Sequence, residues 1–490
     1  MNRRDALKTI GGTLLAAPGI LRAAGRRPGD KPNLLFLWTD QQRADTMAAY
    51  GNRTYRVPAM NRLAAQSIVF DRCYVTQPVC TPSRTSVMTG LWPHMAGTVD
   101  NNIPLKPETK TLPELLGDSD YRTGYMGKWH LGDEVFAQHG FQQWRAIEDG
   151  IYNGFYSAGR DRNARSHYHH FLVRMGYKPD EQNFFGRSFA TTLPVEHSKP
   201  SFLANEASRF IFENRNDPWI LYVNTLEPHT PFSSALNDLH SDEEAPVPEN
   251  YPGIPEGGEP ECYRRRRQSA IKDKPFDLRS RAGWQKLSRH YAGLCSLVDQ
   301  AAARILWALE ASGQAENTIV VWTSDHGEMR GAHSLQGKGV MYEEAVRVPL
   351  LLRVPFRGQK PQRVLPPGSH IDLVPTLLEL LGKKEADELP GRSLLPFISG
   401  ARRENGDVFI EWTGDQEDQQ ESDARTVITP EGLKLVLHNR DTSVLFDRTR
   451  DPLELQNVYA GAGQAKVRSA LRAKIEQWQR RVKDKMRLPA

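Results

Sequence analysis

Short apolar runs recur at wide spacing along this 490-residue chain, and they constrain its fold more than any other feature. Continuous apolar runs of about four to eight residues are typical of strands buried on both faces of a parallel sheet. Segments 203–212 and 287–310 have the apolar spacing of helices and lie between these runs. The sequence therefore predicts an α/β fold with a doubly wound, mostly parallel sheet. Its clearest strands are residues 33–38, 219–223, 318–322 and 348–354.

The pattern changes after residue 395. Four short runs separated by turn residues precede a final segment with an apolar stripe at helical spacing. We therefore predict two units, an α/β domain over residues 30–395 and a smaller α+β subdomain over 396–490, with an antiparallel sheet and a terminal helix. The expected strands are residues 408–412, 424–428, 433–438 and 443–446, and the stripe consists of Val467, Leu471, Ile475, Trp478 and Val482.

Two polar segments, 152–193 and 233–280, interrupt the α/β pattern. Long loops of this kind often carry binding specificity. The second segment contains four consecutive arginines, residues 264–267. No recognised nucleic-acid-binding module surrounds this run, so we expect a solvated loop and no nucleic-acid partner, with contact to a polyanionic sugar chain as the alternative.

The first 25 residues have the composition of an export signal. Arg3 and Arg4 precede a short, weakly apolar stretch that ends in small residues, a pattern that resembles twin-arginine signals. An ordinary N-terminal amphipathic helix is the alternative. The segment contributes +3 to the net charge of +5, so the remaining chain is close to neutral. No apolar run reaches about 18 residues. We expect an exported, periplasmic or extracellular protein without stable membrane insertion.

Polar side chains follow three of the expected strands. In open α/β sheets the ligand lies beyond the carboxyl ends of the strands, so these residues are expected to converge. Carboxylate and amide oxygens with one imidazole suit a divalent cation, and a hard ion such as Ca²⁺ is favoured. The alternative is that each Asp only caps a turn or a helix. The converging residues are Asp40 and Gln41 after the first strand, Asn224 and His229 after the second, and Asp325 and His326 after the third. The expected cation ligands among them are Asp40, Gln41, Asp325 and His326.

The segment from Cys80 to Arg84 reads Cys-Thr-Pro-Ser-Arg. Pro82 fits the first turn of a helix, where its missing N–H is harmless. Cys80 then lies at the positive end of that helix, which stabilises an anion and activates a nucleophile. On these grounds alone, a reactive thiol and a structural cysteine remain equally open.

Residues 80–90 match the signature of the type I sulfatase family throughout, with Cys-x-Pro-x-Arg followed by Thr-Gly. The chain resembles this formylglycine-dependent family of the alkaline-phosphatase-like superfamily over nearly its whole length. The resemblance implies an alkaline-phosphatase-like fold. Further motifs occur in the family's order: Gly127-Lys128-Trp129-His130, Glu227-Pro228-His229, Asp325-His326-Gly327 and Gly337-Lys338.

The resemblance also implies a mechanism. Cys80 would be oxidised to Cα-formylglycine by a formylglycine-generating enzyme, and the hydrated aldehyde would offer two hydroxyls on one carbon. One hydroxyl attacks the sulfur of a sulfate ester, and deprotonation of the other expels sulfate. Carried over by position, Asp40, Gln41, Asp325, His326 and modified Cys80 hold the metal; Arg84 supports the hydrated aldehyde and the sulfate charge; Lys128 and Lys338 clamp sulfate; Lys338 or His229 protonates the leaving alcohol; and His130 is the base for the second hydroxyl.

Gln41 departs from the second Asp found in many members of the family. The amide still offers an oxygen but removes one negative charge. Ca²⁺ is favoured and Mn²⁺ is the alternative, given His326. The expected function is hydrolysis of a sulfate ester, of a sulfated carbohydrate or small molecule. The alternatives are a phosphonate monoester or phosphodiester hydrolase of the same superfamily, and a catalytically silent sugar-binding relative.

Overall fold

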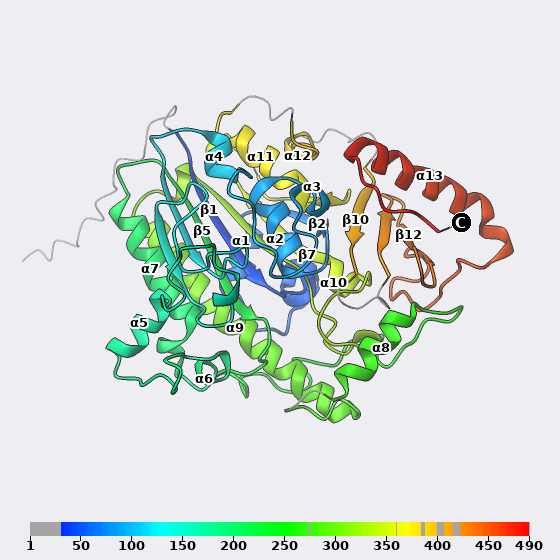
Figure 1. Cartoon of the computed structure of the whole chain (residues 1–490), viewed down its shortest axis with the longest axis horizontal. Helices are drawn as coiled ribbons and strands as arrows, with labels where there is room; N and C mark the ends of the chain where they lie inside the picture. Colours follow the sequence, from blue (N-terminus) through cyan, green and yellow to red (C-terminus); the bar gives the residue numbers. More distant parts are fainter. Residues whose placement is uncertain are drawn as a thin grey trace, which may run out of the picture.

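The computed structural model describes residues 31–272, 275–358, 360–383, 388–398, 406–414 and 422–489. The export signal expected over residues 1–25 lies outside these residues. Within the described part, nine strands form one sheet in the order β4-β3-β5-β1-β6-β7-β2-β8, with β9 beside β2. They are β1 (Asn33–Asp40), β2 (Ile68–Tyr74), β3 (Arg122–Gly127), β4 (Gln143–Ala146), β5 (Trp219–Pro228), β6 (Thr318–Ser324), β7 (Arg347–Arg353), β8 (Gln362–Val364) and β9 (Gly368–Ser369). Figure 1 labels β1, β2, β5 and β7 of this sheet.

The apolar runs expected to be strands occupy the middle of this sheet. β1 pairs in parallel with β5 on one side and with β6 on the other, so their carboxyl ends meet at one edge. The run 348–354 also forms a strand, β7, but it runs antiparallel to β6 and to β2. The expectation that this strand runs parallel to its neighbours was therefore wrong. An apolar run indicates that a strand is buried and carries no information about its direction.

Side chains of β1 alternate between two cores. Leu34, Phe36 and Trp38 face one core, and Leu35 and Leu37 face the other. The first core is shared with α2 (Cys80–Thr89), α4 (Leu112–Leu116) and α11 (Leu373–Leu380). The second is shared with α1 (Pro58–Ala65), α7 (Lys199–Glu213) and α9 (Arg281–Ala311). Helices thus cover both faces of a mixed, mostly parallel sheet, which confirms the predicted doubly wound α/β fold.

One described helix, α9, is long and apolar enough by composition to cross a membrane. Within its most apolar window, 72% of the residues are buried inside the protein, as expected for a core helix.

The two polar segments contain short helices. Residues 152–193 include α5 (His167–Arg174) and α6 (Arg187–Ala190). The arginine run lies on α8 (Glu261–Ala270), so the expected solvated loop was wrong. Arg267 pairs with Glu259, and the guanidinium of Arg266 lies over the Trp412 ring. These contacts order the helix against the C-terminal sheet.

That C-terminal sheet is antiparallel and four-stranded, in the order β10-β11-β12-β13. Leu471 and Ile475 of the terminal helix α13 (Ala465–Val482) are buried on it, as the apolar stripe predicted. Figure 1 shows this unit beside the larger sheet. The strands are β10 (Val408–Trp412), β11 (Ala424–Ile428), β12 (Leu433–His438) and β13 (Val444–Asp447), and the remaining short helices are α3 (Pro93–Ala96), α10 (Glu343–Val346) and α12 (Leu395–Ile398).

His94 links the short helix α3 to the C-terminal unit. Its Nδ1 lies 2.5 Å from Oε2 of Glu411, a fully buried residue of β10, and its Nε2 lies 3.1 Å from the carbonyl oxygen of Val482. Both ring nitrogens face acceptors, so both carry protons. Against the opposing effect of burial, the Glu411 carboxylate raises the pKa of His94. A positive ring at the end of α13 also complements the helix dipole.

Glu411→Gln is expected to lower the free energy of unfolding by about 2 kcal/mol at acid pH, the usual scale for a charge-assisted hydrogen bond. Because the pKa of His94 is raised by folding, its contribution is complete below the unfolded value of about 6.5 and is lost as pH rises through the folded value. Denaturant titrations across this pH range measure the loss. His94→Gln should cost a similar amount, and the double variant little more. If the difference in free energy of unfolding between the wild type and Glu411→Gln did not change with pH, the ionic link between His94 and Glu411 would be refuted.

Candidate active site

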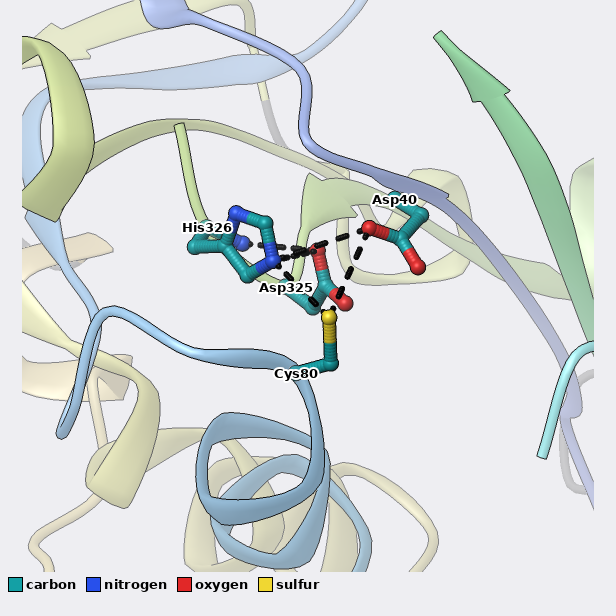
Figure 2. Close-up of side chains that lie close together, drawn as sticks. All are labelled: Asp40, Cys80, Asp325 and His326. Atoms are coloured by element: carbon teal, nitrogen blue, oxygen red, sulfur yellow. Dashed lines mark hydrogen bonds and ion pairs between the residues drawn. The ribbon is translucent and has the colours of Figure 1, made fainter. Parts of the chain in front are cut away.

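The carboxyl ends of β1 and β6 and the first residue of α2 meet in one buried cluster. Asp40 is the last residue of β1, Asp325 and His326 follow β6, and Cys80 begins α2. Figure 2 shows the four side chains pointing toward one another. Their ligand atoms all lie within 4.8 Å of each other. His326 Nε2 is 3.2 Å from Cys80 Sγ and 3.6 Å from Oδ1 of each Asp. The convergence expected at this edge of the sheet is therefore present.

Arg84 binds one oxygen of each carboxylate and so fixes the position of both. Its guanidinium is fully buried and donates to Asp40 Oδ2 and Asp325 Oδ2, each at 2.9 Å. A third nitrogen, Nη1, donates to Asn224 Oδ1 at 3.0 Å. The guanidinium thereby occupies the outer oxygens, while the inner oxygens, Oδ1 of each Asp, face His326 Nε2. Asp325 Oδ1 also accepts from the backbone N–H groups of Gln41 at 3.0 Å and His326 at 2.8 Å. These contacts make Arg84 a positioning group for both carboxylates.

Cys80 occupies the N-terminal residue of α2, as the position of Pro82 predicted. Lys128 Nζ lies 3.8 Å from its Sγ and also donates to Asp40 Oδ2. Burial, the largest influence, and Asp40 act to raise the pKa of the thiol, but Lys128, Lys338 and His326 outweigh them and lower it to about 6. The signature cysteine thus lies in a strongly cationic environment.

The turn that carries Lys128 and His130 has a fixed shape. Gly127 has a φ of 126°, and a Cβ there would lie 1.8 Å from the carbonyl oxygen of Asn224, so only glycine fits. The Glu134 carboxylate accepts from the backbone N–H groups of Trp129 at 2.8 Å and of His130 at 2.7 Å. This arrangement directs Lys128 toward Asp40.

His130 is held in one tautomer. Its Nε2 lies 2.9 Å from Oδ1 of Asn102, so Nε2 carries the proton. Its Nδ1 is buried, and within the described residues it has no hydrogen-bond partner. Burial, together with Lys128 and Arg84, lowers the pKa of His130 well below its usual range. The ring is therefore neutral with Nδ1 as a free acceptor. It packs against Tyr152, with ring centroids 4.5 Å apart.

His229 and Lys338 lie at the border of the cluster. His229 Nδ1 donates to the carbonyl oxygen of Thr230 at 2.6 Å, and the ring lines a pocket beside the cluster. Burial, together with Lys338 and Lys128, lowers the pKa of His229 well below its usual range. Lys338 Nζ donates to Gln41 Oε1 at 2.7 Å. Every residue expected at the site thus lies within or beside one cluster.

The amide of Gln41 is oriented by Glu328, a buried residue that sequence reasoning missed. Gln41 Nε2 donates to Glu328 Oε2, so its Oε1 faces Lys338 on the other side. Glu328 Oε1 accepts from the backbone N–H groups of Arg330 at 2.8 Å and Gly337 at 2.7 Å. The carboxylate therefore fixes both the Gln41 amide and the loop that carries Lys338. Asn102, Glu134 and Tyr152 were also missed, because they come from loops without a distinctive sequence pattern.

Comparison with known proteins identifies the family. The profile described as Sulfatase matches residues 32–383, which is most of the chain. The chain belongs to the sulfatase family. A second profile, described as N-sulphoglucosamine sulphohydrolase, C-terminal, matches residues 331–481 of this sulfatase. The protein is accordingly a sulfuric ester hydrolase.

Similar proteins cover the sulfatase almost end to end. The uncharacterised sulfatase YidJ of Escherichia coli is 30% identical, over 93% of this chain and 89% of its own. An N-acetylglucosamine-6-O-sulfatase of Bacteroides thetaiotaomicron is 26% identical, over 93% and 87%. The structure of BT4656 in complex with its substrate D-glucosamine-2-N,6-O-disulfate has a TM-score of 0.74 at 24% identity, over 93% and 99%. A phosphonate monoester hydrolase from Silicibacter pomeroyi has a TM-score of 0.77 at 22% identity, over 92% and 95%. These structures share the alkaline-phosphatase-like fold.

The family implies a metal ion and a formylglycine, and the residues of this sulfatase fit both. Two inner carboxylate oxygens and one imidazole nitrogen converge on a centre that Arg84 leaves open. Two carboxylates buried this close to each other are stable only with compensating positive charge. Cys80, the signature residue, borders the same centre.

Glu328→Gln is expected to weaken the binding of divalent cations about tenfold or more, the usual cost of removing a group that orients a ligand. Its new amide would keep Oε1 on the two backbone N–H groups and turn NH₂ toward Gln41. The Gln41 amide would then reverse and place NH₂ where Oε1 now lies beside Lys338, so its oxygen could no longer serve as the expected cation ligand. Calorimetric titration with Ca²⁺ and with Mn²⁺ measures the effect.

Asp299→Asn is the matched control, since Asp299 is also buried but accepts from the backbone N–H groups at the start of α1. It should lower stability and leave cation affinity unchanged. Equal affinity in the wild type and Glu328→Gln would show that Gln41 does not depend on Glu328.

Proposed function

We propose that this sulfatase hydrolyses a sulfate ester of a carbohydrate, using a formylglycine derived from Cys80 and a divalent cation, for which Ca²⁺ is favoured over Mn²⁺. The single observation that supports this most is the position of Cys80. It begins a helix, lies among Asp40, Asp325 and His326, and is bordered by Lys128.

The absent groups would supply defined chemistry. The hydrated formylglycine offers two hydroxyls on one carbon, one to attack sulfur and one whose deprotonation releases sulfate. Asp40, Asp325, His326 and Gln41 would hold the cation, which supplies Lewis-acid polarisation of a sulfate oxygen. Arg84 keeps the two inner carboxylate oxygens in place for this role.

Lys128 and Lys338 would bind the transferring sulfate. Lys128 reaches position 80 from one side, and Lys338 reaches Gln41 from another. Both ammonium groups are held by fixed partners before substrate arrives. Cations fixed in advance around a developing anionic transition state contribute a large part of catalysis.

His130 would accept a proton from the second hydroxyl, and His229 would donate one to the leaving alcohol. His130 is neutral with Nδ1 as an unpartnered acceptor, the form required of a base for the second hydroxyl. His229 lines the pocket beside the cluster, where the alcohol would leave. Burial, together with Lys338 and Lys128, keeps His229 neutral in the free protein. The charge of a bound sulfate ester would offset those lysines and raise the pKa of His229 toward the protonated form that an acid requires.

A carbohydrate is the substrate class best supported by the relatives. The N-acetylglucosamine-6-O-sulfatase aligns over 93% of this chain, and the neighbour solved with a glucosamine disulfate has the same fold. Maturation would require a formylglycine-generating enzyme. Export by way of the N-terminal segment would give the enzyme access to extracellular glycans.

Replacing Cys80 tests the proposal directly. Free sulfate should be released from sulfated mono- or oligosaccharides by the wild type and not by Cys80→Ala, because alanine cannot become an aldehyde. Mass spectrometry of the Cys80 peptide should show formylglycine in active wild-type enzyme. Activity that survives the substitution would refute the nucleophile.

The second candidate function is hydrolysis of phosphonate monoesters or phosphodiesters, and the fold shared with a phosphonate monoester hydrolase favours it. Assays with these phosphorus esters and with a sulfate ester distinguish the two functions. We expect kcat/KM to be higher for the sulfate ester. A preference for the phosphorus esters by orders of magnitude would make that hydrolase activity the main one. An unmodified Cys80 with no turnover of either would indicate a silent sugar-binding relative.

His229→Ala should slow hydrolysis of a sugar sulfate by about 10²–10⁴, the usual contribution of a general acid. Hydrolysis of nitrophenyl sulfate should fall far less, since nitrophenolate leaves without a proton. Comparing kcat/KM for the two substrates measures this dependence. Lys338→Ala is the companion variant and should slow both substrates alike. If Lys338→Ala instead shows the dependence on the leaving group, Lys338 is the acid.

A further inference from the structure

One arginine of the polar segment 152–193 lies at the edge of the active site. Arg187, the first residue of α6, donates from Nη2 to the Tyr152 hydroxyl at 2.9 Å and from Nε to Glu148 Oε2 at 2.6 Å. Tyr152 in turn packs on the ring of His130. Arg187 is thus connected to the catalytic cluster through a single side chain.

A second cation lies beside the first. Lys199, a buried residue at the start of α7, donates to Glu148 Oε1. One carboxylate therefore serves two cations, and these three residues together carry one excess positive charge. Arg187 and Lys199 line the same pocket as His229 and Glu227. Burial raises the pKa of Glu227 to about 7, so that carboxyl offsets the excess only in part at neutral pH.

The guanidinium of Arg187 retains an unused donor. Among the described residues, its hydrogen bonds engage Nε and Nη2, and none engages Nη1. Nη1 is also absent from the buried polar atoms without a partner, and the side chain is 17% exposed. This N–H₂ group is therefore accessible, and two anchored contacts fix its direction. A donor held in advance binds an anion with little loss of conformational entropy.

We propose that Arg187, supported by Lys199 and Glu148, binds a second anionic substituent of the saccharide, a carboxylate or a further sulfate, next to the ester that is cleaved. This inference rests on the proposed function, since it places the leaving sugar against His229, with its second charged substituent at Arg187, which lines the same pocket. The enzyme would then prefer sugars that carry two negative charges.

The test compares two sugars that differ in one charge. N-acetylglucosamine 6-O-sulfate and glucosamine 2-N,6-O-disulfate are assayed as competitors of nitrophenyl sulfate hydrolysis and for their own release of sulfate. Wild-type enzyme should bind the disulfate about tenfold or more tightly, the scale of one charge-assisted hydrogen bond. Arg187→Ala should bring the ratio of the two inhibition constants close to one, and Arg187→Lys should restore part of it.

Arg174→Ala is the matched control, since Arg174 is an exposed arginine of the same segment, on α5. It should keep the wild-type ratio. If Arg187 had a purely structural role, Arg187→Ala would weaken the binding of both sugars equally. The ratio of the two inhibition constants would then stay unchanged, which would overturn the inference. Equal binding of the two sugars by wild-type enzyme would also overturn it. Failure of the proposed function is distinct, since wild-type enzyme would then release no sulfate from nitrophenyl sulfate either.

Discussion

The buried bridge from Arg84 to Asp40 and Asp325 is the interaction on which the active site depends. Two carboxylates at the ends of neighbouring strands repel each other strongly in a dry interior. Arg84 takes one oxygen from each and leaves the other facing inward. The same helix that carries Arg84 begins with Cys80 one turn earlier, so one rigid element sets both the nucleophile and the ligands. Loss of this bridge would therefore disorder the whole cluster.

The sequence could predict this centre because its parts lie on regular elements. Strands β1, β5 and β6 each contain a continuous apolar run followed by polar residues at the carboxyl end, and β1 pairs in parallel with the other two. The helix at Cys80 follows from Pro82. Other strands were not predicted for physical reasons. β2 carries Asp71 and Arg72, and β3 contains two glycines and begins with an exposed Arg122, so neither has a continuous apolar run.

What the sequence could not reveal is how distant loops are joined. Glu328 orients Gln41 from 287 residues away in the sequence, and Asn102 holds His130 from another loop, yet neither contact has a spacing rule. Arg187 likewise reaches the site only because the polar segment folds back over Tyr152. Long-range hydrogen bonds of this kind depend on tertiary packing, which local periodicity does not encode. The segment's composition indicated binding, and the structure adds which side chain faces the site.

Gln41 and Glu328 together suggest where specificity arises. At a position expected to contribute a cation ligand, the Gln41 amide has no charge where a carboxylate would have one, and Glu328 places a carboxyl group one side chain further out. The reacting group therefore meets a more positive field, because Coulomb attraction weakens with distance. Sulfate esters, phosphodiesters and phosphonate monoesters all carry one negative charge, so this field attracts all three alike. The three esters differ in the substituents on sulfur or phosphorus, so discrimination among them depends on the side chains that contact those substituents, whereas Arg187, as proposed, would select among leaving sugars by their charge.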